Sequence, residues 1–169
     1  MISNRIRLLK KRFSTYNLDG YIVPKNDEFF SEYAVRDRLK NISNFSGSAG
    51  LAIITHKKNF LFVDGRYTLQ AQEQCGKNFK IIEIHKFLPH KILKNITLGF
   101  DPSVFTYKQL NIYFKKNIKL KAISKNLIDE LCKIKLPKAK IFYSLKDKIV
   151  GESTKSKINK IVSVLKKYK

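Results

Sequence analysis

Few side chains in this sequence have the types and the spacing that chemistry requires. His85 and His90 flank Pro89, but no carboxylate or cysteine is positioned to complete a metal site with them. Cys75 and Cys132 are the only cysteines, and their spacing matches no metal-binding or redox motif. Patterns such as H-E-x-x-H, C-x-x-C and G-x-S-x-G are absent. We therefore predict no catalytic residue, metal ligand or cofactor in this chain, and two free thiols in a reducing cytoplasm.

The loop Gly47-Ser48-Ala49-Gly50 has the composition of a phosphate-binding turn. Such turns follow a strand and open into a helix, where backbone amides and the helix dipole meet the anion. Here the loop leads into an apolar run at 51–55 that is typical of a strand, and no Gly-Lys-Ser/Thr follows. We interpret Gly47 and Gly50 as structural residues that allow a tight turn and a close backbone approach.

Positive charge dominates the 169-residue chain, whose formal net charge is +22 at pH 7. Lys and Arg together number 35, and only six of these are arginine. Lysine accompanied by abundant Ile, Asn, Phe and Tyr is typical of drift in an AT-rich genome, whereas phosphate recognition favours clustered arginine. Composition drift and a small basic nucleic-acid-binding protein both stay open as interpretations. In either case we expect weak, salt-sensitive adhesion to polyanions.

The composition also bounds the class of protein. With 43% hydrophobic residues, 12 Phe and 8 Tyr, the chain can bury a core. No apolar run approaches the roughly 20 residues that a membrane span needs. Residues 1–19 alternate basic and apolar positions, unlike a secretory signal. We expect a cytoplasmic protein without a membrane segment.

Apolar periodicity predicts alternating strands and helices. The predicted strands are 21–23, 51–55, 60–63, 80–84, 96–100 and 118–123, and the predicted helices are 4–17, 67–75, 87–93 and 107–116, with a helical turn at 28–33. The polar connection 56–59 has hairpin length. The pattern favours an α/β fold with a mixed sheet of about six strands, including one hairpin, flanked by helices.

Two local roles follow from this assignment. Asp64 is placed to cap the helix 67–75 by accepting from its free amides. The aromatic residues that could stack on bases are more typical of a core at strand and helix spacing, and we assign them to it. They are Tyr21, Phe29, Phe30, Tyr33 and Phe45.

The character of the sequence changes beyond Leu131. We assign residues 1–132 to one domain and 133–169 to a basic linker and a last helix capped by Ser153. The apolar stripe of that helix must dock on another surface; it comprises Ile158, Ile161, Val162 and Leu165. We therefore expect the start of a second unit that is cut short.

An ordered series of short motifs carries a resemblance to a known family. The series is Tyr21-Ile22-Val23-Pro24, Asp27, Ser31-Glu32-Tyr33, Arg38-Leu39, Ile42-Ser43, Phe45, Gly47-Ser48-Ala49-Gly50, Asp64-Gly65-Arg66-Tyr67 with Gln70-Ala71, Gly99-Phe100-Asp101-Pro102 and Asn126-Leu127-Ile128-Asp129. Over residues 1 to about 132 it resembles the N-terminal domain of Xaa-Pro aminopeptidases (aminopeptidase P) of the creatinase/prolidase superfamily.

The resemblance implies a mixed sheet similar to the ribonuclease H architecture. It also implies a hydrolase of the metallopeptidase type, whose two divalent metals, usually manganese, lie in a C-terminal catalytic domain that is missing here. The chain would be inactive alone and would serve dimerisation and shaping of the active-site cleft. Its partners would be the catalytic domain, in cis or in trans, and a further copy in a homo-oligomer. Residues 133–169 would then begin a truncated second domain, of a trimmed chain or of a split gene.

One substrate-binding residue is carried over from the family. Arg38 matches an arginine in the loop before the Gly-Ser-Ala-Gly turn, which is suggested to pair with a substrate carboxylate or to hold the rim of a partner subunit's cleft. The alternative is that Arg38 braces its own loop through Asp37 or nearby carbonyls. Leu39 stands where many relatives have a second arginine.

The remaining matches are interpreted as structural. Asp64, Gly65, Arg66 and Tyr67 match the family's Asp-Gly-Arg-Tyr motif, with Asp64 as a cap and Tyr67 in packing. Asp101 makes a turn with Pro102 after the strand 96–100.

Overall fold

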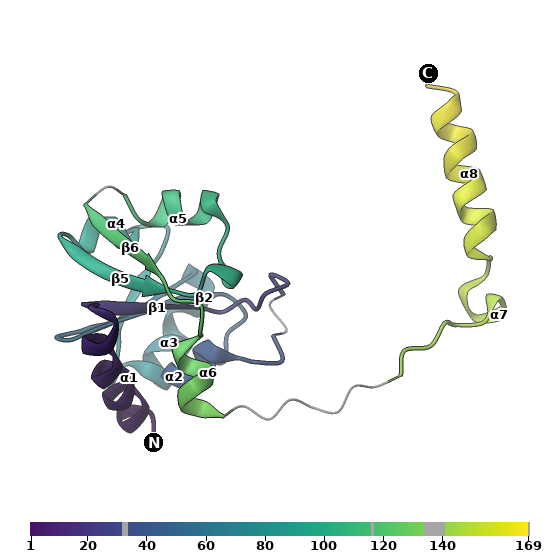
Figure 1. Cartoon of the computed structure of the whole chain (residues 1–169). Coiled ribbons are helices and arrows are strands. Elements are labelled where there is room, and N and C mark those ends of the chain that lie inside the picture. The colour runs from purple at the N-terminus through teal and green to yellow at the C-terminus, as the bar shows by residue number, and fades with distance from the viewer. Residues whose placement is uncertain (32–33, 116, 134–140, 169) are drawn as a thin grey trace. The chain divides into compact units, whose positions relative to one another are not determined.

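The computed structural model divides into two units, Met1–Leu136 and Pro137–Lys169. A mixed six-stranded sheet forms the centre of the first unit. The structure describes residues 1–31, 34–115, 117–133 and 141–168. In sheet order the strands are β4 (Lys80–Glu83), β3 (Asn59–Val63), β2 (Gly50–Thr55), β1 (Gly20–Pro24), β5 (Ile96–Phe100) and β6 (Ile118–Ala122). β2 runs antiparallel to β1 and β3, and every other pairing is parallel (Figure 1). The expected mixed sheet with one hairpin is confirmed.

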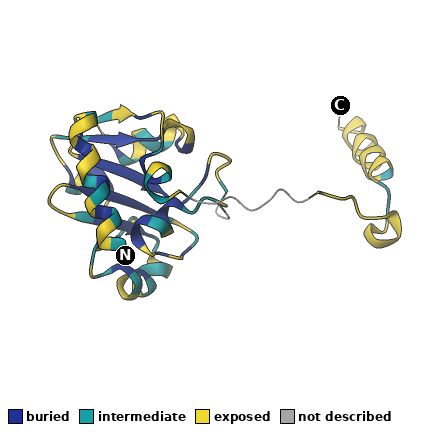
Figure 2. Cartoon of the chain, turned by 60° about the horizontal axis from the view of Figure 1, so that its bottom comes forward, coloured by how far each residue is buried: buried dark blue, intermediate teal, exposed yellow. Residues whose placement is uncertain are grey.

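Helices cover both faces of this sheet (Figure 1). One face carries α1 (Ile2–Tyr16), α2 (Arg38–Ser43), α3 (Thr68–Cys75) and α6 (Leu127–Cys132), and the other carries α4 (Pro89–Ile92) and α5 (Tyr107–Tyr113). Because strand side chains alternate between faces, Tyr21 and Val23 of β1 pack with the first group and Ile22 packs with the second. Every residue of β1 is buried, and Figure 2 shows this burial along the central strands. The carboxyl end of β1 therefore has a defined position within the core of the sheet.

The structure corrects several of the helical predictions; the helix predicted at 107–116, for example, ends at Tyr113. The helical turn predicted at 28–33 is only a single turn at 28–29, closed by a hydrogen bond from the Phe30 amide to the Asp27 carbonyl (3.0 Å). The amides of Phe29 and Ser31 donate to the Asp27 side chain, and residues 32–33 lie outside the described residues. The helix predicted at 87–93 covers only Pro89–Ile92, because proline favours the first turn of a helix. The sequence did not predict α2, a six-residue helix capped by the Asp37 side chain.

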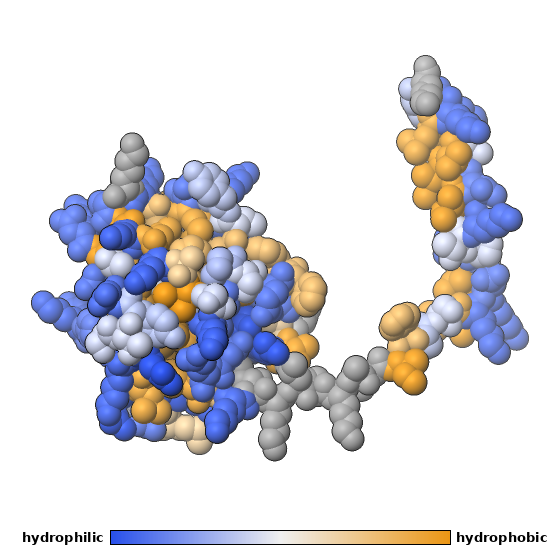
Figure 3. Space-filling view, in the orientation of Figure 1, coloured by the Kyte–Doolittle hydropathy of each residue, from blue (hydrophilic) through white to orange (hydrophobic). Residues whose placement is uncertain are grey.

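The second unit contains α7 (Asp147–Val150) and α8 (Thr154–Lys166). The Ser153 side chain accepts a hydrogen bond from the Ser156 amide, so the predicted cap of the last helix is confirmed. The apolar stripe of α8 is exposed (Figure 3) and comprises Ile158, Ile161, Val162 and Leu165. No helix among the described residues is long and apolar enough to cross a membrane.

Gly47 lies against a ring of the core, and this packing can be tested. A Cβ at Gly47 would lie 2.3 Å from Cζ of Phe45, which is fully buried and has no room to move. We expect Gly47→Ala to lower the free energy of unfolding by about 1–3 kcal/mol, as overpacking does. Gly65→Ala is the matched control, since its Cβ would lie 3.3 Å from the flexible Glu83 carboxylate. Urea denaturation measures both variants, and equal stabilities would contradict the packing.

Candidate functional site

The loop that follows β1 spans residues 25–37, of which 25–31 and 34–37 are described; it is called the 25–37 loop and only these residues are meant. It begins at the carboxyl end of β1, the edge at which the parallel neighbour β5 also ends. Ligands of open α/β sheets bind at this edge, where the loops gather. A cleft of about 360 Å³ adjoins the loop, and Phe30, Gly50, Asp64 and Phe105 are among the residues that line it.

An ion cluster around Arg38, the first residue of α2, connects the loop to α6. The Arg38 side chain is 2% exposed. Its Nε donates to Asp129 Oδ1 (2.9 Å), and its Nη2 donates to Asp129 Oδ2 (2.7 Å) and to Glu28 Oε1 (2.6 Å). Nη1 of Arg36 contacts the same Asp129 Oδ2 at 3.4 Å. Arg38 Nη1 is buried and has no hydrogen-bond partner among the described residues.

The cluster shifts the pKa values of its members. Burial alone would lower the pKa of the Arg38 guanidinium, but the hydrogen bonds and charges of Asp129 and Glu28 outweigh burial and raise that pKa above its ordinary value. The hydrogen bond from Arg38 lowers the pKa of the Glu28 carboxyl. Arg38 and Glu28 are therefore both charged at neutral pH, and their contact is an ion pair.

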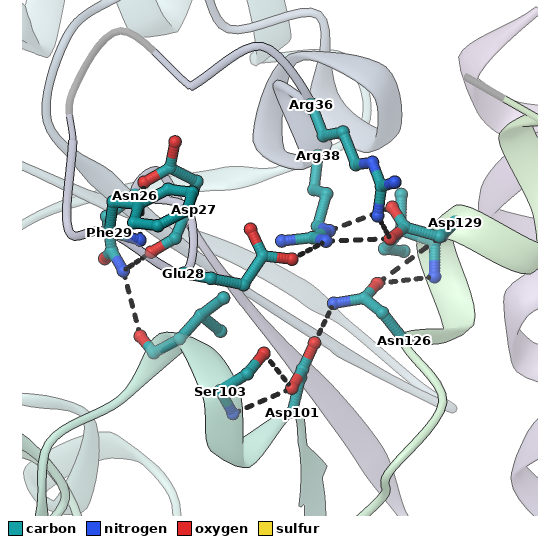
Figure 4. Close-up of polar contacts among 12 residues, drawn as sticks. Asn26, Asp27, Glu28, Phe29, Arg36, Arg38, Asp101, Ser103, Asn126 and Asp129 are labelled. Carbon is teal, nitrogen blue, oxygen red and sulfur yellow. Dashed lines mark hydrogen bonds and ion pairs between the residues drawn. The ribbon is translucent and has the colours of Figure 1, made fainter. Parts of the chain in front are cut away.

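A second set of hydrogen bonds fixes α6, the helix that carries Asp129. Asn126 Oδ1 accepts from the amides of Ile128 (3.0 Å) and Asp129 (3.4 Å) at the start of α6. Asn126 Nδ2 donates to Asp101 Oδ2 (2.8 Å), and Asp101 Oδ1 accepts from the amide and the hydroxyl of Ser103. Asp101 is buried directly after β5, so these contacts tie α6 to the sheet (Figure 4).

Further contacts close the base of the loop. Lys25 Nζ and Asp37 Oδ2 form an ion pair at 2.5 Å, so Asp37 pairs with Lys25 and with the α2 amide that it caps. Asn26 Nδ2 donates to the carbonyl of Val104 (2.9 Å) beyond β5. The loop is thus anchored at both ends and at its first turn, where Asp27 accepts two backbone amides.

The loop nevertheless carries exposed aromatic rings. Phe29 is 88% exposed and Phe30 is 44% exposed, so their assignment to the core is wrong, whereas Tyr21 and Phe45 are buried as predicted. Tyr33 lies outside the described residues. Phe30 has φ 58°, a left-handed backbone that costs roughly 1–2 kcal/mol for an L-residue. The surrounding contacts must therefore hold the turn that displays both rings.

The Asp64–Tyr67 motif follows β3 at the same edge of the sheet. Asp64 Oδ1 accepts from the Arg66 amide (2.9 Å) and from Arg66 Nε (3.0 Å). It therefore caps the short 3₁₀ turn Gly65–Tyr67, and the prediction that it caps the following helix is corrected, because α3 begins only at Thr68. The Tyr67 hydroxyl lies 2.8 Å from that of Ser48, which joins the motif to the 47–50 loop.

The histidines lie apart from one another in separate surroundings. Exposed His85 Nε2 is 3.7 Å from Asp64 Oδ2, whereas buried His90 Nδ1 is 3.2 Å from the carbonyl oxygen of Tyr113. In the part of the chain that the structure describes, no group of three or more His, Cys, Asp or Glu side chains could hold a metal ion.

The fold and the braced loop define an α/β domain with one antiparallel strand in an otherwise parallel sheet. The sequence matches the creatinase/prolidase N-terminal domain over residues 5–131, and the chain belongs to this family.

The curated relatives that this chain matches are longer than the chain itself. Xaa-Pro aminopeptidase 1 of Dictyostelium discoideum is 32% identical over 190 residues, which cover 98% of this chain and 30% of that protein. The crystal structure of an X-prolyl aminopeptidase from Caenorhabditis elegans, described as a cytosolic enzyme with a di-nuclear active site, matches with TM-score 0.75 and 24% identity over 99% of this chain and 31% of that one. The N-terminal domain of the cytoplasmic peptidase PepQ from Mycobacterium tuberculosis matches with TM-score 0.57 and 22% identity over 76% of this chain and 98% of that one. The chain thus spans less than a third of the length of the curated relatives it matches.

The acid side of the pH–stability curve tests the cluster. The folded-state pKa of Glu28 is lowered, so its ion pair stabilises the fold above the unfolded-state pKa, about 4.3, and this contribution is lost as pH falls through the lower folded value. We expect Glu28→Gln to reduce the free energy of unfolding at pH 7 and to flatten its decrease between about pH 5 and pH 3. Urea titrations across this range measure the slope. Glu130→Gln, at an exposed position without an ion pair among the described residues, is the control; equal slopes for the two variants would contradict the assignment.

Proposed function

We propose that this chain is the non-catalytic N-terminal domain of a Xaa-Pro aminopeptidase, where it serves dimerisation and shapes the active-site cleft. The full enzyme would release the N-terminal residue that precedes proline. The observation that carries the proposal is the coverage: 98% of the chain aligns with a Xaa-Pro aminopeptidase, yet this is only 30% of that relative. The remaining length of such a protein is where the catalytic machinery belongs in this proposal, and a cytoplasmic location agrees with the cytosolic C. elegans enzyme.

The metal chemistry belongs to that remainder. The described residues offer no donor set that fits a dinuclear centre. Two divalent metals, with manganese as the first candidate, would activate a water there for attack on the bond before proline. The contribution of this chain is geometric: it presents a surface to the catalytic domain and to a partner subunit.

The 25–37 loop is the surface that we assign to the cleft of a partner subunit. It displays Phe29 and Phe30 on a turn that the Asp27 side chain holds by two hydrogen bonds, and large exposed aromatic side chains are typical of interface anchors. Arg38 is the candidate substrate contact. Its Nε and Nη2 are engaged by Asp129 and Glu28. The remaining donor, Nη1, is buried, so a substrate contact requires that the assembled enzyme makes Nη1 accessible.

The other matched residues stabilise segments next to this loop by packing and hydrogen bonding. Gly47 and Gly50 admit the ring of Phe45 at close range, and the Asp64–Tyr67 motif and Asp101 hold neighbouring turns. The charge of +22 adds weak adhesion to polyanions, which physiological salt screens.

Peptidase assays test the division of labour. The 169-residue chain supplied with Mn²⁺ should not cleave a Xaa-Pro peptide, whereas the same chain joined to, or mixed with, its catalytic remainder should. Sequencing the gene downstream of the Lys169 codon identifies the catalytic remainder if the reading frame stays open. If a stop codon follows, the remainder is sought as a separate protein that acts in trans. Release of the N-terminal amino acid is measured, with a chelator as the control. Turnover by the isolated chain would overturn the proposal.

Truncation of an exposed ring tests the interface. Phe29→Ala should leave stability unchanged, since the ring is 88% exposed, but should weaken dimerisation of the full enzyme about tenfold or more, as the loss of an aromatic anchor does. Sedimentation over a concentration series gives the dimer Kd. Leu69→Ala removes a similarly exposed side chain (85%) on α3 and is the matched control. Equal Kd values for the two variants would remove the loop from the interface.

A further inference from the structure

We propose that Asp129 is a positioning residue. It fixes the 25–37 loop through Arg38 and Glu28, and it thereby sets the geometry with which this loop meets the active-site cleft of the partner subunit. The inference deepens the function proposed above and rests on it for the role of the loop. Asp129 lies on α6, 91 residues along the chain from Arg38. Asp129 is therefore far in sequence from the loop that it controls.

The first step of the argument is the bidentate pair. The two carboxylate oxygens of Asp129 accept from Nε and Nη2 of Arg38 at 2.9 and 2.7 Å. Two parallel hydrogen bonds define the plane of a guanidinium as well as its distance. Oδ2 is also 3.4 Å from Nη1 of Arg36, which belongs to the loop itself. One carboxylate thereby holds the arginines on either side of the cap residue Asp37.

The second step leads from Arg38 to the exposed rings. Nη2 of Arg38 is 2.6 Å from Glu28 Oε1. Glu28 directly precedes Phe29 and Phe30, the two residues that the loop displays. Moving the guanidinium of Arg38 therefore moves the side chain that holds this turn, and Phe30 in its left-handed conformation would relax without that restraint.

The third step is that Asp129 is itself fixed. Asn126 caps α6 and donates to Asp101, which is 5% exposed at the end of β5. Figure 4 shows these contacts in sequence, from Asp101 through Asn126 to Asp129, and on through Arg38 to Glu28. These contacts therefore connect the loop to the sheet through α6.

Removing the charge of Asp129 while keeping its shape tests the proposal. Asp129→Asn leaves one acceptor oxygen and points an amide at a donor of Arg38, so the bidentate pair is lost. Glu130→Gln makes the same carboxylate-to-amide change at the next, exposed position of α6 and is the matched control. In the 169-residue chain, we expect amide hydrogen exchange at residues 25–31 to accelerate about tenfold or more, the equivalent of one charge-assisted hydrogen bond, with β1 and β2 unchanged.

The assembled enzyme supplies the second readout. Asp129→Asn should raise KM for a Xaa-Pro peptide about tenfold while kcat changes little, because the metal-bearing domain is intact. Unchanged exchange in the loop, or equal acceleration in the loop and in the strands, would overturn the positioning role. Accelerated exchange with an unchanged KM supports the positioning role and overturns the role of the loop at the cleft.

A second variant covers the case in which Asp129→Asn fails to fold. Glu28→Gln breaks only the loop side of the cluster and leaves Arg38 paired with Asp129. It should accelerate exchange at residues 25–31 and leave α6 unchanged. If exchange of the loop is the same as in the unmodified chain, the contact from Arg38 to Glu28 does not hold the turn and the proposal is wrong.

Discussion

The buried guanidinium of Arg38 is the constraint on which the site depends. A charge that is 2% exposed cannot stay in place without opposite charge beside it, because desolvation would cost several kcal/mol. The neutralising carboxylates come from Glu28, ten residues before it, and from Asp129, 91 residues after it. The loop after β1, helix α2 and helix α6 must therefore meet at one point. The stability of the ion cluster depends on Arg38, Glu28 and Asp129 together, so their contributions are cooperative.

The sheet supplies the frame in which this meeting can occur. β1 and β5 are parallel neighbours, so the segments that follow them emerge at the same edge. β1 leads into the loop with Glu28, and β5 leads into Asp101, which holds the cap of α6. The antiparallel β2 begins at the same edge, at Gly50, where small residues let Phe45 approach. Regular hydrogen bonding of the strands is thereby converted into defined positions for side chains that are remote in sequence.

The sequence predicts the sheet better than it predicts the site, for a physical reason. Strand alternation is a local and repeated signal. The bounds of each predicted strand therefore lie within a residue or two of the observed bounds, and those of β5 (96–100) are identical. Helix α2 has six residues and only two apolar positions on its buried side, Leu39 and Ile42, too short a repeat to detect. The partners of Arg38 carry no local pattern at all, because a carboxylate on an exposed surface and one that neutralises a buried arginine look alike in sequence.

The loop aromatics show the same limit from the other side. Phe29 and Phe30 follow a buried strand, and a hydrophobic pair there is most often core. The turn closed by Asp27 directs both rings outward instead, at the cost of the left-handed backbone at Phe30. In the function proposed for the loop, a turn that is already held by such contacts would lose little further conformational entropy on binding. Rigidity of this kind requires anchors outside the loop, and the ion cluster with α6 is the anchor that a buried charge makes obligatory.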